Sequence, residues 1–136
     1  MLNRRGFVSG ALGAAVGLAL FQGNADAQDA PKYPLRFLAK TEYPGDKYAC
    51  ILVSEDLSPG QRVARHMHSG VESSYIATGS ITLSIQGEPD LVVKAGDGYQ
   101  IPPLTPHSVQ NGPEKSTIVA TFIVEKDKPL VQSVPG

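Results

Sequence analysis

Two histidines and a glutamate lie close together in the middle of the sequence, and both residue types bind metal ions. His66 and His68 are separated by one residue, and Glu72 follows four positions after His68. The residues before the pair have strand character, and a strand places residues i and i+2 on one face with Cα atoms about 7 Å apart. Imidazoles at that spacing can reach one ion through bonds of about 2.1 Å. A short turn predicted at residues 69–71 would bring the Glu72 carboxylate back toward the same ion.

The third and last histidine, His107, follows a proline-rich stretch and is the candidate for a fourth ligand. Three imidazoles and one carboxylate leave one or two coordination positions open, as in a catalytic or ligand-binding metal site rather than a structural one. These ligands suit iron, manganese, nickel, copper and zinc, and imidazole discriminates poorly among them. The residues therefore indicate a divalent transition-metal site of unspecified metal.

Both histidine-containing stretches resemble the two signature motifs of the cupin superfamily. The first motif is G-x5-H-x-H-x3,4-E-x6-G, and its fixed positions are matched by Gly60, His66, His68, Glu72 and Gly79. The second is G-x5-P-x-G-x2-H-x3-N, and it is matched by Gly96, Pro102, His107 and Asn111. The resemblance implies that His66, His68, Glu72 and His107 together bind the metal.

One position departs from the second motif, because Leu104 stands where the motif has its middle glycine. Leucine at a positive φ would cost on the order of 1–2 kcal/mol. We expect instead a turn reshaped by Pro103 and Pro106, which leaves His107 in place. Asn111 is expected to order the backbone after His107.

Beyond residue 27 the chain consists of short segments of alternating polarity separated by turns rich in glycine and proline. The segment 81–86 alternates strictly, with Ile81, Leu83 and Ile85 on one face, and residues 117–125 give the longest such signal. Strands are expected at 35–39, 48–55, 61–68, 72–77, 81–86, 91–95, 99–102, 107–110 and 117–125. This spacing predicts an all-β sandwich or barrel. The cupin resemblance implies a jelly-roll, or double-stranded β-helix, barrel with room for one small ligand.

The start of the chain has the features of an export signal. Arg4 and Arg5 precede an apolar stretch at 7–21, and Ala25-Asp26-Ala27 has the small-x-small pattern of a cleavage site. The string from Arg4 resembles a twin-arginine signal. We expect a signal peptide at 1–27, a single cupin domain at 28–136 and a periplasmic or secreted product. Export through the general secretory pathway, or retention of the apolar stretch as an anchor, are the alternatives.

Composition excludes some partners. The chain has 12 basic and 13 acidic residues, a formal net charge of −1 and no basic stripe, which argues against nucleic-acid binding. Its single cysteine, Cys50, cannot form an internal disulfide and is expected to be a small buried hydrophobe. We expect a small-molecule ligand, no membrane contact after signal cleavage and, by resemblance to other small cupins, a homodimer.

The resemblance extends to quercetin-dioxygenase-like cupins, which implies a metal-dependent oxidoreductase acting on a small organic substrate. Glu72 would then be catalytic, because it would leave the metal and accept a proton itself. Arg62 has the same strand parity as His66, so it would clamp an anionic group of the substrate if it faces inward, or reach solvent if it sits at the strand start. A non-catalytic binding module and a cupin isomerase or lyase are the alternative functions.

Overall fold

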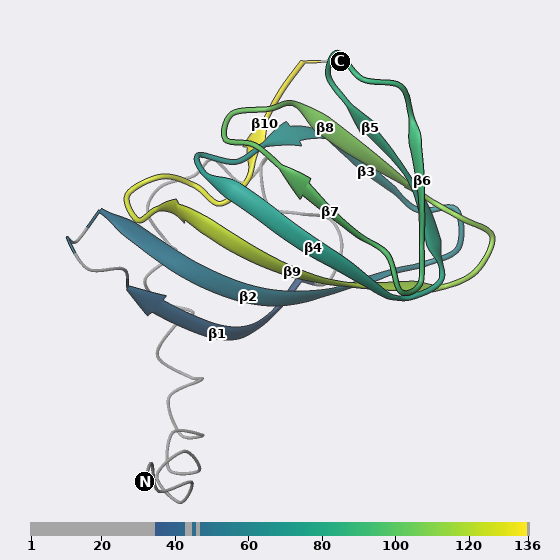
Figure 1. Cartoon of the computed structure of the whole chain (residues 1–136), viewed down its shortest axis with the longest axis horizontal. Coiled ribbons are helices and arrows are strands. Elements are labelled where there is room, and N and C mark those ends of the chain that lie inside the picture. Colours follow the sequence, from purple (N-terminus) through teal and green to yellow (C-terminus); the bar gives the residue numbers. More distant parts are fainter. Residues whose placement is uncertain (1–34, 43–44, 46, 136) are drawn as a thin grey trace, which may run out of the picture.

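The computed structural model describes residues 35–42, 45 and 47–135, and every regular element in this part of the chain is a β-strand. The predicted export signal at 1–27 lies outside it. Within the described residues, no helix has the length and hydropathy needed to cross a membrane. The strands, shown in Figure 1, are β1 (Leu35–Glu42), β2 (Tyr48–Leu57), β3 (Arg62–Met67), β4 (Val71–Thr78), β5 (Ser80–Ile85), β6 (Leu91–Lys94), β7 (Gly98–Ile101), β8 (His107–Asn111), β9 (Ser116–Glu125) and β10 (Gln132–Ser133).

The strands form two five-stranded antiparallel sheets packed face to face (Figure 1). One sheet has the order β1-β2-β9-β4-β7, and the other has the order β10-β3-β8-β5-β6. Within the described residues, the chain changes sheet after β2, β3, β4, β6, β7, β8 and β9. Strands distant in sequence therefore become neighbours, and this double-sheet arrangement confirms the predicted all-β jelly-roll fold.

The core lies between the sheets and follows the period-two alternation of the strands. In β9 the buried side chains are Ile118, Ala120, Phe122 and Val124, which confirms the predicted inward face of that strand. From the other sheet, Ile81 and Leu83 are buried, whereas Ile85 is half-buried. Each fully buried aliphatic side chain stabilises the fold by about 1.5–3 kcal/mol relative to an exposed one.

The predicted strands are all present, with ends that differ by up to three residues, the largest difference being at β1. β10 was not predicted, because a strand of two residues has no alternation to detect. It pairs with β3, placing Gln132 opposite Met67 and Ser133 opposite His66. The C-terminal segment therefore lies along the strand that carries His66.

Cys50 differs from its prediction, because it is half-buried rather than buried. It lies on the face of β2 opposite to the buried Ile51, in register with Ile123, which is 41% exposed. The alternation of β2 is regular there, so Cys50 belongs to the outward face of its sheet rather than to the core.

The connection from β3 to β4 depends on a close backbone approach at Gly70. A Cβ atom at this position would lie 1.7 Å from the carbonyl oxygen of Ile123 in β9. Only glycine fits there, and the chain can therefore cross tightly from one sheet to the other. This crossing brings Glu72 of β4 toward the histidines of the opposite sheet.

Candidate metal centre

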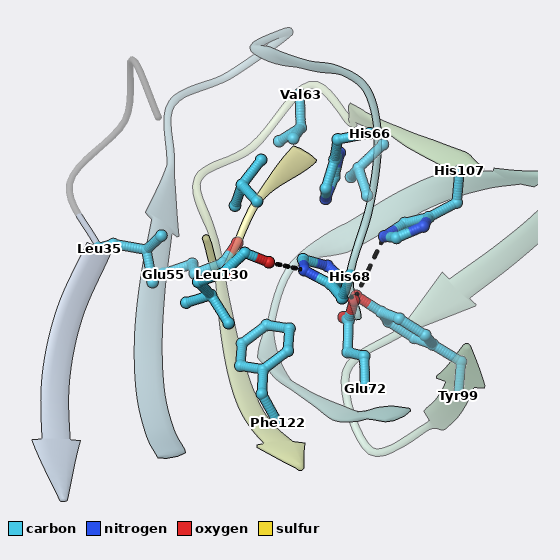
Figure 2. A pocket seen from close by; sticks show the side chains of 12 residues that line it. Leu35, Glu55, Val63, His66, His68, Glu72, Tyr99, His107, Phe122 and Leu130 are labelled. Carbon is cyan, nitrogen blue, oxygen red and sulfur yellow. Dashed lines mark hydrogen bonds and ion pairs between the residues drawn. The ribbon is translucent and has the colours of Figure 1, made fainter. Parts of the chain in front are cut away.

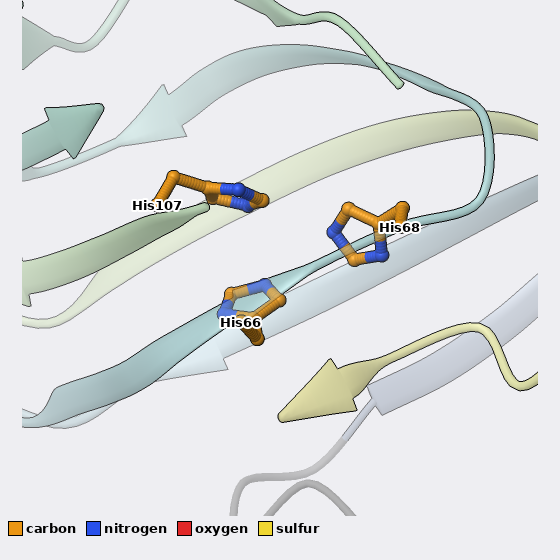
Figure 3. A group of neighbouring side chains, drawn as sticks. All are labelled: His66, His68 and His107. Atoms are coloured by element: carbon orange, nitrogen blue, oxygen red, sulfur yellow. The ribbon is translucent and has the colours of Figure 1, made fainter. Parts of the chain in front are cut away.

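Three imidazoles converge between the two sheets. His66 lies in β3, His68 follows that strand directly, and His107 begins β8. The two strands pair with His66 opposite His107, so these rings are cross-strand neighbours. Ring centroids lie 4.2 Å apart for His66 and His107, 4.9 Å for His66 and His68, and 5.2 Å for His68 and His107. One nitrogen from each ring lies within 4.8 Å of the others, and all three residues are buried (Figure 3).

Each imidazole is oriented by a main-chain carbonyl oxygen. The Nδ1 atoms of His66, His68 and His107 lie 2.8, 2.5 and 2.9 Å from the carbonyl oxygens of Ala64, Leu130 and Thr105 respectively. A carbonyl oxygen can only accept, so Nδ1 carries the proton that is donated and Nε2 is left free. Partners of this kind fix the tautomer and ring orientation of metal-binding histidines.

Glu72 reaches the same point from the other sheet. Its Oε2 lies 3.2 Å from Nε2 of His68 and 3.3 Å from Nε2 of His107 (Figure 2). The second oxygen, Oε1, accepts a 2.6 Å hydrogen bond from the Ser74 hydroxyl. Burial alone would raise the pKa of Glu72, but the His107 and His68 side chains beside the carboxylate outweigh burial and hold that pKa well below its usual value.

The donor set fits a metal ion. With Nδ1 protonated, neutral His68 and His107 each direct an Nε2 lone pair toward the ionised Glu72 carboxylate, so acceptors face acceptors. Both Nε2 atoms are buried without a hydrogen-bond partner among the described residues. A cation between them would satisfy the imidazoles and the carboxylate together, whereas leaving buried polar atoms unsatisfied is costly. The chain therefore holds a three-histidine cluster suited to a divalent metal.

His66 is prepared to act as a neutral ligand. Burial and, to a smaller extent, the nearby His107 together lower its pKa from 6.5 to about 4, although the hydrogen bond to Ala64 acts in the opposite direction. Its imidazole is thus uncharged at neutral pH, which is the form that binds metals. A metal does not have to displace a proton from this residue.

The histidines face a small cavity between the sheets. The cavity measures ≈ 340 Å³ including open solvent at its mouth, and its enclosed part has room for about one water molecule or ion. Its apolar wall is made by Leu35, Val63, Val109, Phe122, Leu130 and Val131 (Figure 2).

The fold and this cluster agree with a family assignment. Residues 53–124, more than half of the chain, match the model of the cupin domain. The chain belongs to the cupin family. The matched range contains every residue of the two cupin motifs, including the three histidines and Glu72. No curated protein gives a significant match to this cupin.

Solved structures share the cupin fold at low sequence identity. A conserved protein with a double-stranded β-helix domain from Klebsiella pneumoniae has a TM-score of 0.58 and 18% identity, covering 82% of this chain and 90% of that one. An oxalate oxidase has a TM-score of 0.56 and 24% identity, covering 63% and 46%. DMSP lyases have a TM-score of 0.58 and 15% identity, covering 63% and 44%. This cupin thus spans less than half the length of the oxidase and lyase chains, and these likenesses show the shared fold.

Leu104 has a positive φ of 54°, so the expectation of a reshaped turn is wrong. The backbone keeps the conformation for which the motif has glycine, and leucine adopts it. The reason is a hydrogen bond of 2.8 Å from the Leu104 N–H to the carbonyl oxygen of His68. This bond links the loop before His107 to the residue that follows β3, so the strained turn connects two of the three histidines.

Asn111 does more than order its own strand end. Its side-chain nitrogen donates to three carbonyl oxygens, those of Leu57 at 3.1 Å, Ser58 at 2.7 Å and Glu114 at 2.9 Å. Leu57 ends β2, Ser58 follows it directly, and Glu114 lies in the loop after β8. The predicted ordering role of Asn111 is confirmed and extends to the turn before β3.

Arg62 does not reach the centre. Its side chain is exposed at the start of β3, and it is absent from the described residues that line the cavity. The parity argument was wrong because the pairing of β3 with β8 shifts register between Val63 and His66. One extra residue in β3 reverses the alternation, so Val63 takes the inward position expected for Arg62. The guanidinium group of Arg62 therefore points into solvent.

The cavity also contains Tyr99 and Glu55, which the sequence motifs did not indicate as site residues. Tyr99 of β7 lies against Ser74 and Glu72, and burial raises the pKa of its phenol well above the usual value (Figure 2). Glu55 of β2 also lines the cavity. The available signal was a charged residue at an inward position of an otherwise apolar alternation. Tyr75 of β4 and Gln100 of β7, which are the neighbours of Ser74 and Tyr99 in sequence, are exposed on the other face of the sheet.

Proposed function

We propose that this cupin binds one divalent transition-metal ion through His66, His68, His107 and Glu72, and acts as a metal-dependent oxidoreductase on a small organic substrate. The observation that carries the proposal is the convergence of three imidazoles and a carboxylate at a cavity whose mouth opens to solvent. An ion with five or six ligands keeps a position for substrate there. The resemblance to dioxygenase-like cupins supports the reaction class.

The residues of the chain have distinct tasks in this proposal. When bound, iron or manganese would supply Lewis acidity and redox chemistry with dioxygen. The neutral histidines hold the ion without cancelling its charge. Glu72 would leave the ion and then accept a proton from the substrate at Oε2, while the Ser74 hydroxyl keeps Oε1 in place. Phe122 packs 4.7 Å from the His68 ring, between centroids, and excludes water from that side.

A non-catalytic binding module is the second candidate, and the small enclosed part of the cavity favours it, because a substrate of several atoms would have to extend from the ion into the open mouth. Isomerase or lyase chemistry is also possible on this fold. Oxygen uptake separates these functions. It is measured on iron- or manganese-loaded protein with a panel of enediols and flavonoids, and the Glu72→Gln variant is the control. Uptake lost in the variant is the expected result. Turnover without oxygen indicates an isomerase or lyase, and tight binding without turnover indicates the module.

Export and assembly belong to the same proposal. Arg4 and Arg5 support twin-arginine export of residues 28–136 to the periplasm, with the metal loaded before export. We expect cell fractionation to find the wild type in the periplasm and an Arg4→Lys, Arg5→Lys double variant in the cytoplasm. An unchanged distribution would contradict this route, and native periplasmic protein holding only copper or zinc would contradict cytoplasmic loading.

A homodimer is supported by uncharged side chains on the outward face of the β4–β9 pair. Val71 lies opposite Ile123 there, and Tyr75 is 50% exposed on the same face. Sedimentation of the wild type as a dimer, and of an Ile123→Glu variant as a monomer, is the expected result. Sedimentation of both proteins as monomers would contradict the dimer.

A further inference from the structure

Glu55 occupies an inward position of β2 that would ordinarily be apolar. On this face of the strand its neighbours are the buried Ala49, Ile51, Val53 and Leu57. Across the sheet, Glu55 lies in register with Ile118 on one side and Leu35 on the other. Its carboxyl group therefore points between the sheets, where it lines the cavity beneath the histidines.

The Glu55 carboxyl group makes no hydrogen bond or ion pair with any residue in the ranges 35–42, 45 and 47–135. Burial raises the pKa of Glu55 to about 8, and the charge of Glu72 contributes in the same direction. Glu55 is half-buried, so its carboxyl group is partly withdrawn from water without gaining a partner, which costs the fold free energy. Glu55 is consequently better explained by a ligand than by the stability of the barrel.

The other polar side chains of the cavity restrict that ligand. They are the three histidines, Glu72 and Tyr99, and no lysine or arginine is among the described residues that line it. An anionic group would find only the metal to neutralise it and would meet two carboxyl groups. A hydroxyl or amine group would instead find an acceptor in Glu55, while the apolar wall contacts the ligand's carbon skeleton.

We propose that Glu55 is the residue that selects the ligand of this cupin: a small, uncharged or cationic organic molecule that presents one oxygen to the metal and a second hydroxyl or amine group to the Glu55 carboxyl group. The inference rests on the proposed metal centre and names the substrate class of that same site. It also accounts for a charged residue inside an apolar strand, because binding sites commonly sacrifice stability for recognition.

The test uses the full chain loaded with cobalt(II), whose visible spectrum reports ligand binding. The probes are catechol, resorcinol and hydroquinone, each compared with its monomethyl ether, which lacks one donor. The protein variants are Glu55→Leu, which removes the hydrogen bond, Glu55→Gln, which keeps a hydrogen-bonding group that cannot ionise, and Asp56→Asn as a matched control on the outward face. Leucine suits this inward position, so Glu55→Leu is expected to fold.

We expect at least one diol to bind the wild type about 10-fold more tightly than its ether, and Glu55→Leu to abolish that difference. Asp56→Asn should leave it unchanged, Glu55→Gln should retain part of it, and cobalt affinity should stay within about 3-fold throughout. Equal diol affinities in the wild type and Glu55→Leu, or no diol preference in the wild type, would overturn the role of Glu55 while leaving the metal centre intact. Failure of the wild type to bind cobalt would overturn the metal centre itself.

Discussion

The Nδ1 atom of His68 lies 2.5 Å from the carbonyl oxygen of Leu130, a residue 62 positions later in the chain. This contact joins the metal centre to the C-terminal segment. The same segment lines the cavity through Leu130 and Val131 and pairs with β3 beside His66. The segment that contains Leu130 therefore supports the site, although the three-histidine cluster lies outside that segment.

Removal of residues 128–136 should weaken metal binding by about 10–100-fold, the range typical of lost supporting hydrogen bonds. The His68 ring would then be free to rotate and to change tautomer. Leu130→Ala is the matched control, since it keeps the carbonyl oxygen and loses only a buried side chain. It should destabilise the fold by about 2–5 kcal/mol while metal affinity changes little. Competition with a chelator measures both affinities, and equal losses in the two variants would refute the positioning role.

Metal-free protein should lose stability as the pH rises from 6.5 to 8. The folded-state pKa of Glu55, about 8, lies above its ordinary value of 4.5, so the folded state binds more protons in this window and stability falls with pH. The pKa of His66 is lowered from 6.5 to about 4, so its contribution to stability still rises by about 0.4 kcal/mol above pH 6.5, which is too little to mask the trend. The net loss is about 1 kcal/mol across the window. Urea unfolding of the wild type and Glu55→Gln should show a downward slope only in the wild type; parallel slopes would disprove the assignment.

Leu104→Gly should be more stable than Leu104→Ala by about 1 kcal/mol. Both changes remove a side chain that is 57% exposed, but only glycine relieves the positive φ of 54°. The N–H that donates to His68 is present in both variants. Denaturant titrations at equal m-values provide the comparison, and an alanine variant at least as stable as the glycine variant would show that the turn is not strained.

Gly70→Ala should destabilise the fold by about 1–3 kcal/mol or more, because the new methyl group would overlap the carbonyl of Ile123. Gly70 also lies between His68 and Glu72, so metal affinity should fall with stability. Gly98→Ala is a milder comparison, since its Cβ would lie 3.0 Å from the Ser74 carbonyl oxygen. Thermal unfolding with and without added metal tests both effects. A Gly70→Ala variant with wild-type stability would contradict the close approach.

Sequence could predict the parts of this molecule that depend on regular patterns. The alternation in β5 and β9 located the strands and their buried faces, and the two histidine motifs indicated which side chains would meet. The sequence pattern could not predict local irregularities of the backbone. The extra residue in β3 that turned Arg62 outward leaves no trace in the periodicity, and the positive φ of Leu104 depends on a hydrogen bond to a distant residue.

Glu55 was missed for a different reason. Its charge was visible in the apolar alternation of β2, but only the packing of the sheets shows that this face borders the metal centre. The contact of Leu130 with His68 was likewise inaccessible, because it depends on a two-residue strand at the end of the chain. Both features arise from tertiary structure rather than from any local pattern.

The most direct test of this account is an X-ray diffraction experiment at the absorption edge of the metal, on crystals of natively purified protein. We expect one anomalous peak between the sheets, with bonds of about 2.0–2.2 Å to His66, His68, His107 and Glu72. Protein whose His107 points away from the other three residues, or whose metal lies elsewhere, would contradict the central claim.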